Sequence, residues 1–346
     1  MKAIVFHGPN DVRVESVPDA AVGDARGAIV RVTKASICGS DLHLVHGTVP
    51  AMPGTIIGHE CVGVVEEVGA DVRRFRKGDR VLVPGVIGCG DCEPCRRGYA
   101  VGCVNLFNKV YGVSPELPGG QAEAIAVPNA DVNLYASPAD LSDEQVLFLT
   151  DILPTGYFAA ENAAIKPGNI VVVIGCGPVG LFAITCAQLF SPSQIFAVDR
   201  VDYRLAQARR LGATPIDASQ QDVRTAVLEA TDGQGAHAVI EAVGATETVH
   251  LAFEVVRVGG VVSVVGVLIQ QDFAFPMGTA LMKDLTFRIG LVNVQRFVPP
   301  LIALIRSGRI EPTGLISHHL PLNDGRHAYA LFGGRQDGCL KVVLAP

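Results

Sequence analysis

The sequence predicts an α/β protein in which a doubly wound parallel-sheet domain is inserted into a mainly β domain. Short β-rich runs broken by turn residues fill about the first 150 residues, and strand and helix patterns alternate from about Ile170. The last fifty residues return to short mixed elements. We therefore expect the inserted domain at residues 153–292, and the other domain at residues 1–152 and 293–346.

Length and composition limit the classes of protein. The 346 residues suffice for two domains, and the composition, 49% hydrophobic and 18% charged, excludes a disordered chain. The net charge of −6 gives no reason to expect nucleic acid or a membrane as partner. The beginning, MKAIVFHGPNDVRVE, lacks the apolar stretch of a signal peptide, so we expect a cytoplasmic protein with reduced thiols.

The mainly β domain is expected to contain short strands separated by glycine-containing turns. These strands are predicted at Ala28–Val32, Cys61–Val68 and Arg80–Pro84, and a last one at Leu340–Leu344. Short strands with this spacing are typical of a small antiparallel barrel or sandwich.

The inserted domain contains Ile170–Phe190, which has no charged residue and is long enough to span a bilayer. Glycines and a proline near its middle favour a buried strand, Ile170–Ile174, a glycine turn and a buried helix, Val179–Phe190. Alternation of strand and helix then continues, which implies a parallel sheet with helices on both faces. The later strands are predicted at Gln194–Val198, Ala236–Ala242 and Val261–Val265, and the later helices at Asp202–Leu211 and Glu247–Val256.

A glycine pattern, G-x-G-x-x-G, joins the first of these strands to its helix and indicates a Rossmann-type dinucleotide site. Asp199 ends the next strand, 19 residues after Gly180, where a carboxylate binds an adenosine ribose and favours NAD over NADP. Arg200 follows it and partly offsets this preference, and a glycine turn without cofactor is the alternative. The candidate cofactor-binding residues are Gly175, Gly177, Pro178, Val179, Gly180, Asp199, Arg200 and Arg204.

The nine cysteines, an odd number, favour metal binding or catalysis over a disulfide framework. Cys89, Cys92, Cys95 and Cys103 have the spacing C-x2-C-x2-C-x7-C. Four thiolates this close can form a tetrahedral site closed to water, so we expect a structural zinc in a lobe at about residues 88–104. An iron–sulfur cluster and disulfides are the alternatives, disfavoured by the long last gap and by the expected compartment.

Two further segments, Cys38-Gly-Ser-Asp-Leu-His43 and Gly58-His-Glu60, are weak signals when taken alone. Together with the four cysteines, Gly119-Gly-Gln-Ala-Glu123, Thr155-Gly156 and the glycine pattern, in this order, they resemble the zinc-containing medium-chain alcohol dehydrogenases. The resemblance covers essentially the whole chain. It implies a GroES-like catalytic domain into which a Rossmann domain is inserted.

The resemblance also implies a catalytic zinc held by Cys38, His59 and a third residue near position 151, which is Asp151 here. Many members of the family have cysteine at that place. The Cys/His/Asp set resembles the branches that contain secondary-alcohol dehydrogenases and glutathione-independent formaldehyde dehydrogenases, and carboxylate is an accepted zinc ligand. A helix N-cap is the alternative role of Asp151.

Residues around this zinc receive roles from the same resemblance. Glu60 resembles the glutamate that approaches the metal when a water or substrate leaves, and Asp41 is expected to orient His59. Ser40 would take the proton of the alcohol, and His43 would pass it to solvent.

Cofactor contacts are implied for Thr155, with the nicotinamide ring, and for Lys341, with the phosphates. The implied activity is that of an NAD-dependent alcohol dehydrogenase with two zinc ions per subunit, acting on small alcohols, aldehydes or ketones. Formaldehyde dehydrogenase or dismutase activity and polyol dehydrogenation are alternatives. A non-enzymatic relative that kept the fold is disfavoured, because it would have lost a metal ligand or a relay residue, and none is lost here. A homotetramer is expected, with a homodimer as the alternative.

Overall fold

The computed structural model describes residues 1–106, 109–113, 116–268 and 272–346. They divide into two compact units: unit 1 comprises Met1–Pro154 and Val292–Pro346, and unit 2 comprises Thr155–Leu291. Unit 2 interrupts unit 1 in the sequence, and its limits differ from the domain limits expected above by a few residues. Helix α5 (Ile152–Asn162) contains the first boundary.

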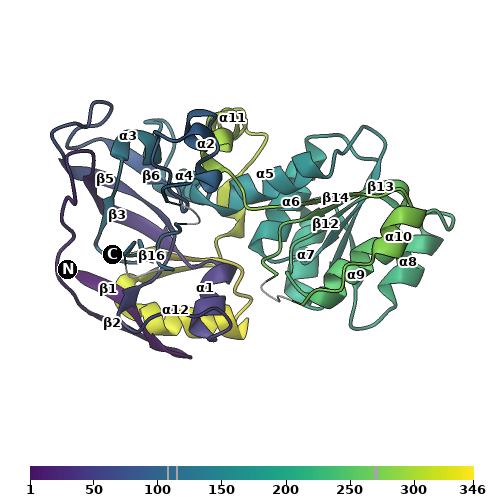
Figure 1. Ribbon diagram of the computed structural model, residues 1–346. Coiled ribbons are helices and arrows are strands. Elements are labelled where there is room, and N and C mark those ends of the chain that lie inside the picture. The colour runs from purple at the N-terminus through teal and green to yellow at the C-terminus, as the bar shows by residue number, and fades with distance from the viewer. Residues whose placement is uncertain (107–108, 114–115, 269–271) are drawn as a thin grey trace. The chain divides into compact units, whose positions relative to one another are not determined.

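The strands of unit 1 form two sheets and are accompanied by short helices, and Figure 1 shows this unit in purple, blue and yellow. The strands are β1 (Lys2–Gly8), β2 (Asp11–Ser16), β3 (Ala28–Ser36), β4 (Thr55–Ile56), β5 (Glu60–Val68), β6 (Arg80–Val83), β7 (Ala124–Val127), β8 (Tyr135–Ala136), β15 (His318–Pro321) and β16 (Val342–Ala345). The helices are α1 (Gly39–Val45), α2 (Glu93–Arg96), α3 (Ala130–Asn133), α4 (Asp143–Leu147), α11 (Val294–Arg306) and α12 (Gly325–Gly334), with 3-10 helices η1 (Ala100–Gly102), η2 (Phe148–Thr150), η3 (Pro312–Leu315) and η4 (Leu322–Asp324).

The larger sheet of unit 1 has the strand order β15-β16-β3-β5-β6-β8, with β7 also paired to β3, and β2-β1-β4 form a second sheet. β3 and β5 are antiparallel, and Ser36 lies opposite Glu60 in their register. On the other side of β3, Ser36 lies opposite Val343 of β16. The sheet thereby brings together segments near positions 36, 60 and 342 that are far apart in the sequence.

Unit 2 alternates strands and helices (Figure 1). The strands are β9 (Ile170–Ile174), β10 (Gln194–Asp199), β11 (Thr214–Asp217), β12 (Ala236–Glu241), β13 (Val256–Val264) and β14 (Thr286–Ile289), and the helices besides α5 are α6 (Pro178–Gln188), α7 (Asp202–Arg210), α8 (Val223–Glu229), α9 (Thr246–Val255) and α10 (Met277–Met282). The sheet order is β11-β10-β9-β12-β13-β14, and every pairing is parallel. The order reverses between β9 and β12, where open α/β sheets bind ligands.

The apolar segment Ile170–Phe190 forms β9, a glycine turn and α6, as predicted. In β9 every residue except Ile170 is buried, and in α6 seven of the eleven residues are buried. None of the helices in the described ranges combines the length and the apolar composition needed to cross a bilayer.

Helix α11 was not predicted, because Pro299 and Pro300 lie inside it. Proline lacks an N–H group and usually ends a helix. Phe297, Leu301 and Ile305 nevertheless lie on one face and are buried, which offsets the lost backbone hydrogen bonds. The shorter elements β11, α8, α10 and β14 were missed as well.

Candidate functional site

Cys38, His59, Glu60 and Asp151 form a cluster in unit 1, and each offers a ligand atom within 4.8 Å of the others. Cys38 closely follows β3, His59 directly precedes β5, and the pairing of these strands joins them. Asp151 directly follows η2. Thiolate, imidazole and carboxylate are the donors that zinc accepts in proteins, so the residues fit this metal.

The donor atoms of this cluster converge. Asp151 Oδ2 lies 3.3 Å from His59 Nε2 and 3.4 Å from Cys38 Sγ. The Ser40 hydroxyl lies 3.2 Å from Cys38 Sγ and 3.1 Å from His59 Nε2. The three ligands implied by the family resemblance therefore lie together, with Ser40 beside them. Asp151 directly precedes α5, where an N-cap would lie, but its carboxylate faces the other two ligands.

Burial and neighbouring charges determine the protonation of the cluster. Burial disfavours the imidazolium of His59, but Asp41, Cys38 and Asp151 favour it more strongly, so the pKa of His59 is raised well above 6.5. Burial, followed by the charges of Asp151 and Glu60, raises the pKa of Cys38. A metal ion that binds here must displace both protons, so its affinity depends on pH.

Asp41 is fully buried and lies on the Nδ1 side of the His59 ring. Its Oδ1 is 3.1 Å from Nδ1 of His59. Its Oδ2 accepts hydrogen bonds from the main-chain N–H of Cys38 at 2.9 Å and from Gln121 Nε2 at 3.1 Å. The Tyr329 hydroxyl donates to Gln121 Oε1 at 2.8 Å. This network leaves Nε2 of His59 facing the other ligands, which is how carboxylate neighbours orient metal-binding histidines.

Ser40 and His43 lie three residues apart on α1 and thus on one side of the helix. Nδ1 of His43 lies 3.1 Å from Thr48 Oγ1, and that hydroxyl donates to the His43 carbonyl at 3.0 Å. Burial, and then the nearby His46, lowers the pKa of His43 below 6.5. The ring is therefore neutral near pH 7 and able to accept a proton.

The position of Lys341 differs from the one expected from the sequence. We expected it to reach the phosphates of a cofactor, but its side chain is completely buried in unit 1. Its ammonium group contacts Glu60 Oε2 at 2.7 Å and donates to the Ile37 carbonyl at 2.7 Å. An ammonium held by these two groups and shielded from solvent is not available to a phosphate.

Three other partners of the site were missed from the sequence: Gln121, Tyr329 and Thr48. Gln121 belongs to the Gly119–Glu123 segment that contributed to the family resemblance. The sequence therefore pointed to this segment, but not to the hydrogen bond between Gln121 and Asp41. Tyr329 lies on α12, more than 200 residues from Gln121, and carries no local signal.

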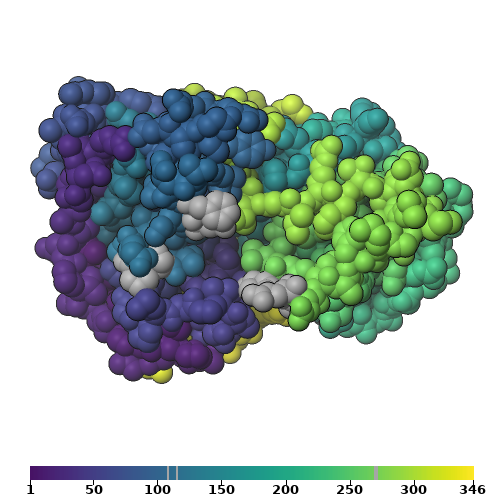
Figure 2. Space-filling model, viewed as in Figure 1, coloured from purple at the N-terminus to yellow at the C-terminus, as the bar shows by residue number. Residues whose placement is uncertain are grey.

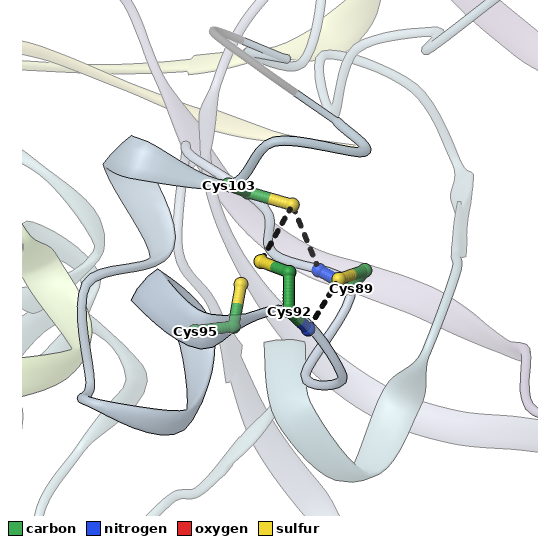
Figure 3. A group of neighbouring side chains, drawn as sticks. All are labelled: Cys89, Cys92, Cys95 and Cys103. Carbon is green, nitrogen blue, oxygen red and sulfur yellow. Dashed lines mark hydrogen bonds between the residues drawn. The ribbon is translucent and has the colours of Figure 1, made fainter.

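The second metal centre consists of Cys89, Cys92, Cys95 and Cys103, whose sulfur atoms lie within 4.8 Å of one another. Figure 3 shows the four side chains turned toward a common centre, with Cys95 on α2 and the others on the adjoining loops. Cys92 Sγ and Cys103 Sγ are 3.9 Å apart. A site of four sulfur donors, mostly buried, fits a structural zinc ion.

Local hydrogen bonds favour thiolate at part of this centre. Burial raises the pKa of Cys89, but the N–H groups of Asp91 and Cys92 and the amide of Asn105 outweigh it and lower the pKa to about 6. Burial, and then the adjoining Cys92 and Cys103, raises the pKa of Cys95 to about 12. A cation is needed to hold all four sulfurs as thiolates.

The candidate dinucleotide site lies in unit 2, at the turn between β9 and α6. Gly175 has a φ of +93°, which favours glycine, and a Cβ on Gly180 would lie 1.8 Å from the Gly175 carbonyl oxygen. A Cβ on Gly177 would have its nearest neighbour, Arg204 Nη1, 3.8 Å away, so the backbone there is open to a ligand. Pro178 and Val179 begin α6, whose first N–H groups can bind a phosphate.

Asp199 ends β10 beside this turn. Its Oδ2 accepts a hydrogen bond from the N–H of Cys176 at 2.7 Å, and Oδ1 accepts from the N–H groups of Arg200 and Val201 at 2.7 and 3.0 Å. Within the described part of the chain, Oδ2 accepts this one hydrogen bond, which leaves a lone pair for a ribose hydroxyl. The side chain of Arg200 is exposed, and Thr155 lies in the first turn of α5.

Comparisons with known proteins agree with this geometry. Residues 24–137 match the alcohol dehydrogenase GroES-like domain, and residues 178–307 match the zinc-binding dehydrogenase family. A probable zinc-binding alcohol dehydrogenase of Mycobacterium tuberculosis is 41% identical over 346 residues, which cover 100% of this chain and 89% of the relative. A glutathione-independent formaldehyde dehydrogenase of Bacillus subtilis is 32% identical over 335 residues, which cover 84% of this chain and 80% of that one.

Among solved structures, the alcohol dehydrogenase TADH from Thermus sp. ATN1 has a TM-score of 0.96 and 44% identity, with 100% of both chains covered. Because both chains are covered completely, the similarity extends through unit 1 and unit 2. The chain belongs to the zinc-type alcohol dehydrogenases.

Proposed function

We propose that the protein is an NAD-dependent alcohol dehydrogenase that reversibly transfers hydride between a primary or secondary alcohol and NAD. The observation that carries this proposal is the convergence of Cys38, His59 and Asp151, with the Ser40 hydroxyl within hydrogen-bonding distance of two of their ligand atoms. We further propose two zinc ions per subunit, one at this cluster and one at the four-cysteine centre.

The side chains around the cluster then have distinct tasks. Zinc held by Cys38, His59 and Asp151 would act as a Lewis acid that lowers the pKa of a bound alcohol. The Ser40 hydroxyl would accept the proton of the alcohol, and His43, on the same side of α1, would take the proton on toward solvent. Asp41 would keep the His59 ring in the orientation that exposes Nε2.

Unit 2 offers the features that an NAD molecule requires. The open backbone at Gly177 and the N-terminus of α6 would bind the pyrophosphate, with the Arg204 guanidinium nearby. Asp199 would accept a hydrogen bond from the adenosine ribose and would repel the additional phosphate of NADP. Bound NAD would supply the hydride acceptor, and Thr155 would contact its nicotinamide ring.

An alcohol panel tests the proposal directly. The purified protein is mixed with NAD and with primary, secondary and polyhydric alcohols, and NADH formation is followed by absorbance. We expect turnover with at least one simple alcohol, and loss of turnover and of about one zinc ion per subunit in Asp151→Ala. No NADH formation with any member of the panel would favour a non-enzymatic relative.

Formaldehyde dehydrogenase activity is a second candidate, favoured by the Cys/His/Asp ligand set and by the similarity to the Bacillus subtilis enzyme. Formaldehyde without glutathione therefore belongs in the same panel. NADH formation from formaldehyde at a higher kcat/KM than from any alcohol would select this activity.

We also propose a homo-oligomer, a tetramer or a dimer. Strand β14 is the last strand in the sheet order of unit 2, and the adjoining α10 exposes Met277, Leu281 and Met282 by 67%, 78% and 80%. The yellow-green segment containing α10 lies at the surface in Figure 2. Exposed apolar side chains of this kind are typical of subunit contacts. Leu281→Glu is expected to reduce the mass measured by light scattering.

We also propose that the protein works in a reducing compartment such as the cytoplasm, because both proposed zinc centres need free thiolates. No disulfide bond joins any of the nine cysteines, all of which lie within the described ranges.

A further inference from the structure

A buried ion pair lies directly behind the catalytic cluster. Lys341 Nζ is 2.7 Å from Oε2 and 3.0 Å from Oε1 of Glu60, and neither side chain is exposed to solvent. The ammonium also donates to the Ile37 carbonyl and lies 5.7 Å from the centre of the Phe148 ring. The Ser36 hydroxyl donates to Glu60 Oε2 as well. Each contact is made inside unit 1.

The partners of Lys341 are adjacent to metal ligands in the sequence. Ile37 precedes Cys38, and Glu60 follows His59, so one ammonium joins the two segments that carry these ligands. Glu60 itself has a carboxylate oxygen within 4.8 Å of the other ligand atoms. Its carboxylate can therefore pair either with the ammonium or with the metal.

Charge decides between these two arrangements. The thiolate of Cys38 and the carboxylate of Asp151 together balance a divalent metal ion, and the ammonium of Lys341 balances Glu60. Removing the ammonium would leave a buried carboxylate without a counter-charge, which is strongly unfavourable. The metal would then be a positive charge within reach, because a carboxylate oxygen of Glu60 lies within 4.8 Å of the other ligand atoms.

We propose that Lys341 is a positioning residue that holds Glu60 off the catalytic metal and so keeps one metal coordination position open for the substrate. This inference rests on the proposed metal centre of Cys38, His59 and Asp151. Lys341 does not touch substrate in this role, and its effect passes through Glu60.

The test uses Co²⁺ in place of zinc in the full-length protein, because the visible spectrum of Co²⁺ responds to its ligands. Imidazole is added as a small metal ligand, and the change in the spectrum gives its Kd. The four-cysteine centre is closed and does not contribute to this change. In Lys341→Met, Glu60 should occupy the open position, so the spectrum changes without imidazole and the Kd for imidazole rises by roughly tenfold or more.

Two further variants separate positioning from damage to the fold. Lys341→Met combined with Glu60→Gln should restore the Kd of the wild type, because glutamine has no charge to be drawn to the metal. In Glu60→Gln alone, imidazole should bind no more tightly than in the wild type, because no carboxylate has to leave the metal. Lys283→Met is the matched control, because Lys283 is a half-buried lysine of unit 2 whose ammonium contacts main-chain carbonyls.

The outcomes are distinct. An unchanged Kd in Lys341→Met, or failure of the double variant to restore it, would overturn the role of Lys341. Tighter imidazole binding in Glu60→Gln would overturn it too, since Glu60 would then already bind the metal in the wild type. If wild-type protein binds Co²⁺ only at the four-cysteine centre, the proposed catalytic metal itself is wrong. If Lys341→Met does not fold, the Kd of Glu60→Gln for imidazole still tests whether Glu60 binds the metal in the wild type.

Discussion

Nδ1 of His59 lies 3.1 Å from Oδ1 of Asp41, and Asp41 is completely excluded from solvent. The distance is that of an ion pair, although the two atoms are not aligned as a hydrogen bond. Asp41 is itself held by the N–H of Cys38 and by the Gln121 amide. One carboxylate thus ties together the segments that carry two of the proposed metal ligands.

Asp41→Asn is therefore expected to weaken metal binding without removing a ligand. Loss of the negative charge reduces the basicity and fixed orientation of His59, which typically lowers metal affinity by about 10- to 100-fold. Competition with a chelator, with released zinc measured by a colorimetric dye, gives the affinity. Asp71→Asn, at an exposed carboxylate, is the control, and equal affinity in the two variants would exclude an orienting role of Asp41.

Cys92→Ser is expected to lower thermal stability more than it lowers activity. Loss of one thiolate should release about one zinc ion per subunit and lower the Tm by roughly 10 °C, because the metal holds the 88–104 lobe together. Metal analysis and calorimetry on the same sample provide both values. Cys186→Ala removes a buried thiol outside both centres and should leave the zinc content unchanged. Full stability of Cys92→Ser would mean that the four cysteines hold no structural metal.

Asp199→Ala is expected to change cofactor preference. The variant loses the ribose contact and the repulsion of a 2′-phosphate, so KM for NAD should rise by roughly tenfold while use of NADP improves. Steady-state kinetics with both cofactors measure this change. Asp202→Ala, at an exposed acid three positions on, should keep the wild-type preference. If Asp199→Ala leaves KM for NAD unaltered, the ribose contact lies elsewhere.

Glu241 ends β12 and is fully buried. Its Oε1 accepts hydrogen bonds from the N–H groups of Val243 and Gly244, both at 2.9 Å, and from the Thr248 hydroxyl at 2.7 Å. Burial nevertheless outweighs these bonds and raises the pKa of Glu241 above its ordinary value of 4.5. The folded state therefore keeps a proton that the unfolded state loses.

A dependence of stability on pH follows from this shift. The pKa of Glu241 is higher in the folded chain than in the unfolded chain. As pH rises from the lower of these two values through the higher one, the unfolded chain binds fewer protons than the folded chain. Glu241 therefore lowers the free energy of unfolding as pH rises. Glu241→Gln cannot lose a proton, and its Tm relative to the wild type should increase as pH rises above 4.5, the ordinary pKa of this carboxyl group. Thermal scans at each pH measure this difference. The exposed Glu247→Gln should show no such trend, and a constant difference for Glu241→Gln would contradict the raised pKa.

Local signals in the sequence were sufficient for the parts of the molecule whose residues are neighbours in the chain. The turn from β9 into α6 contains its glycines, its proline and its apolar strand within a few residues, and its position was predicted. The four cysteines lie within fifteen residues, so their spacing alone predicted a common metal. Helix α11 was missed because its two prolines oppose local helix propensity and only burial of its apolar face stabilises it.

The sequence by itself thus determined the order of the domains, the four-cysteine centre and the glycine turn, because each depends on residues close together in the chain. Only the tertiary structure decided the place of Lys341, since its partners Ile37 and Glu60 are about 300 residues away and reach it through the pairing of β16 with β3 and of β3 with β5. A lysine in a sequence is ordinarily a solvated charge. Its burial against Glu60 is a consequence of sheet register, which no local pattern contains.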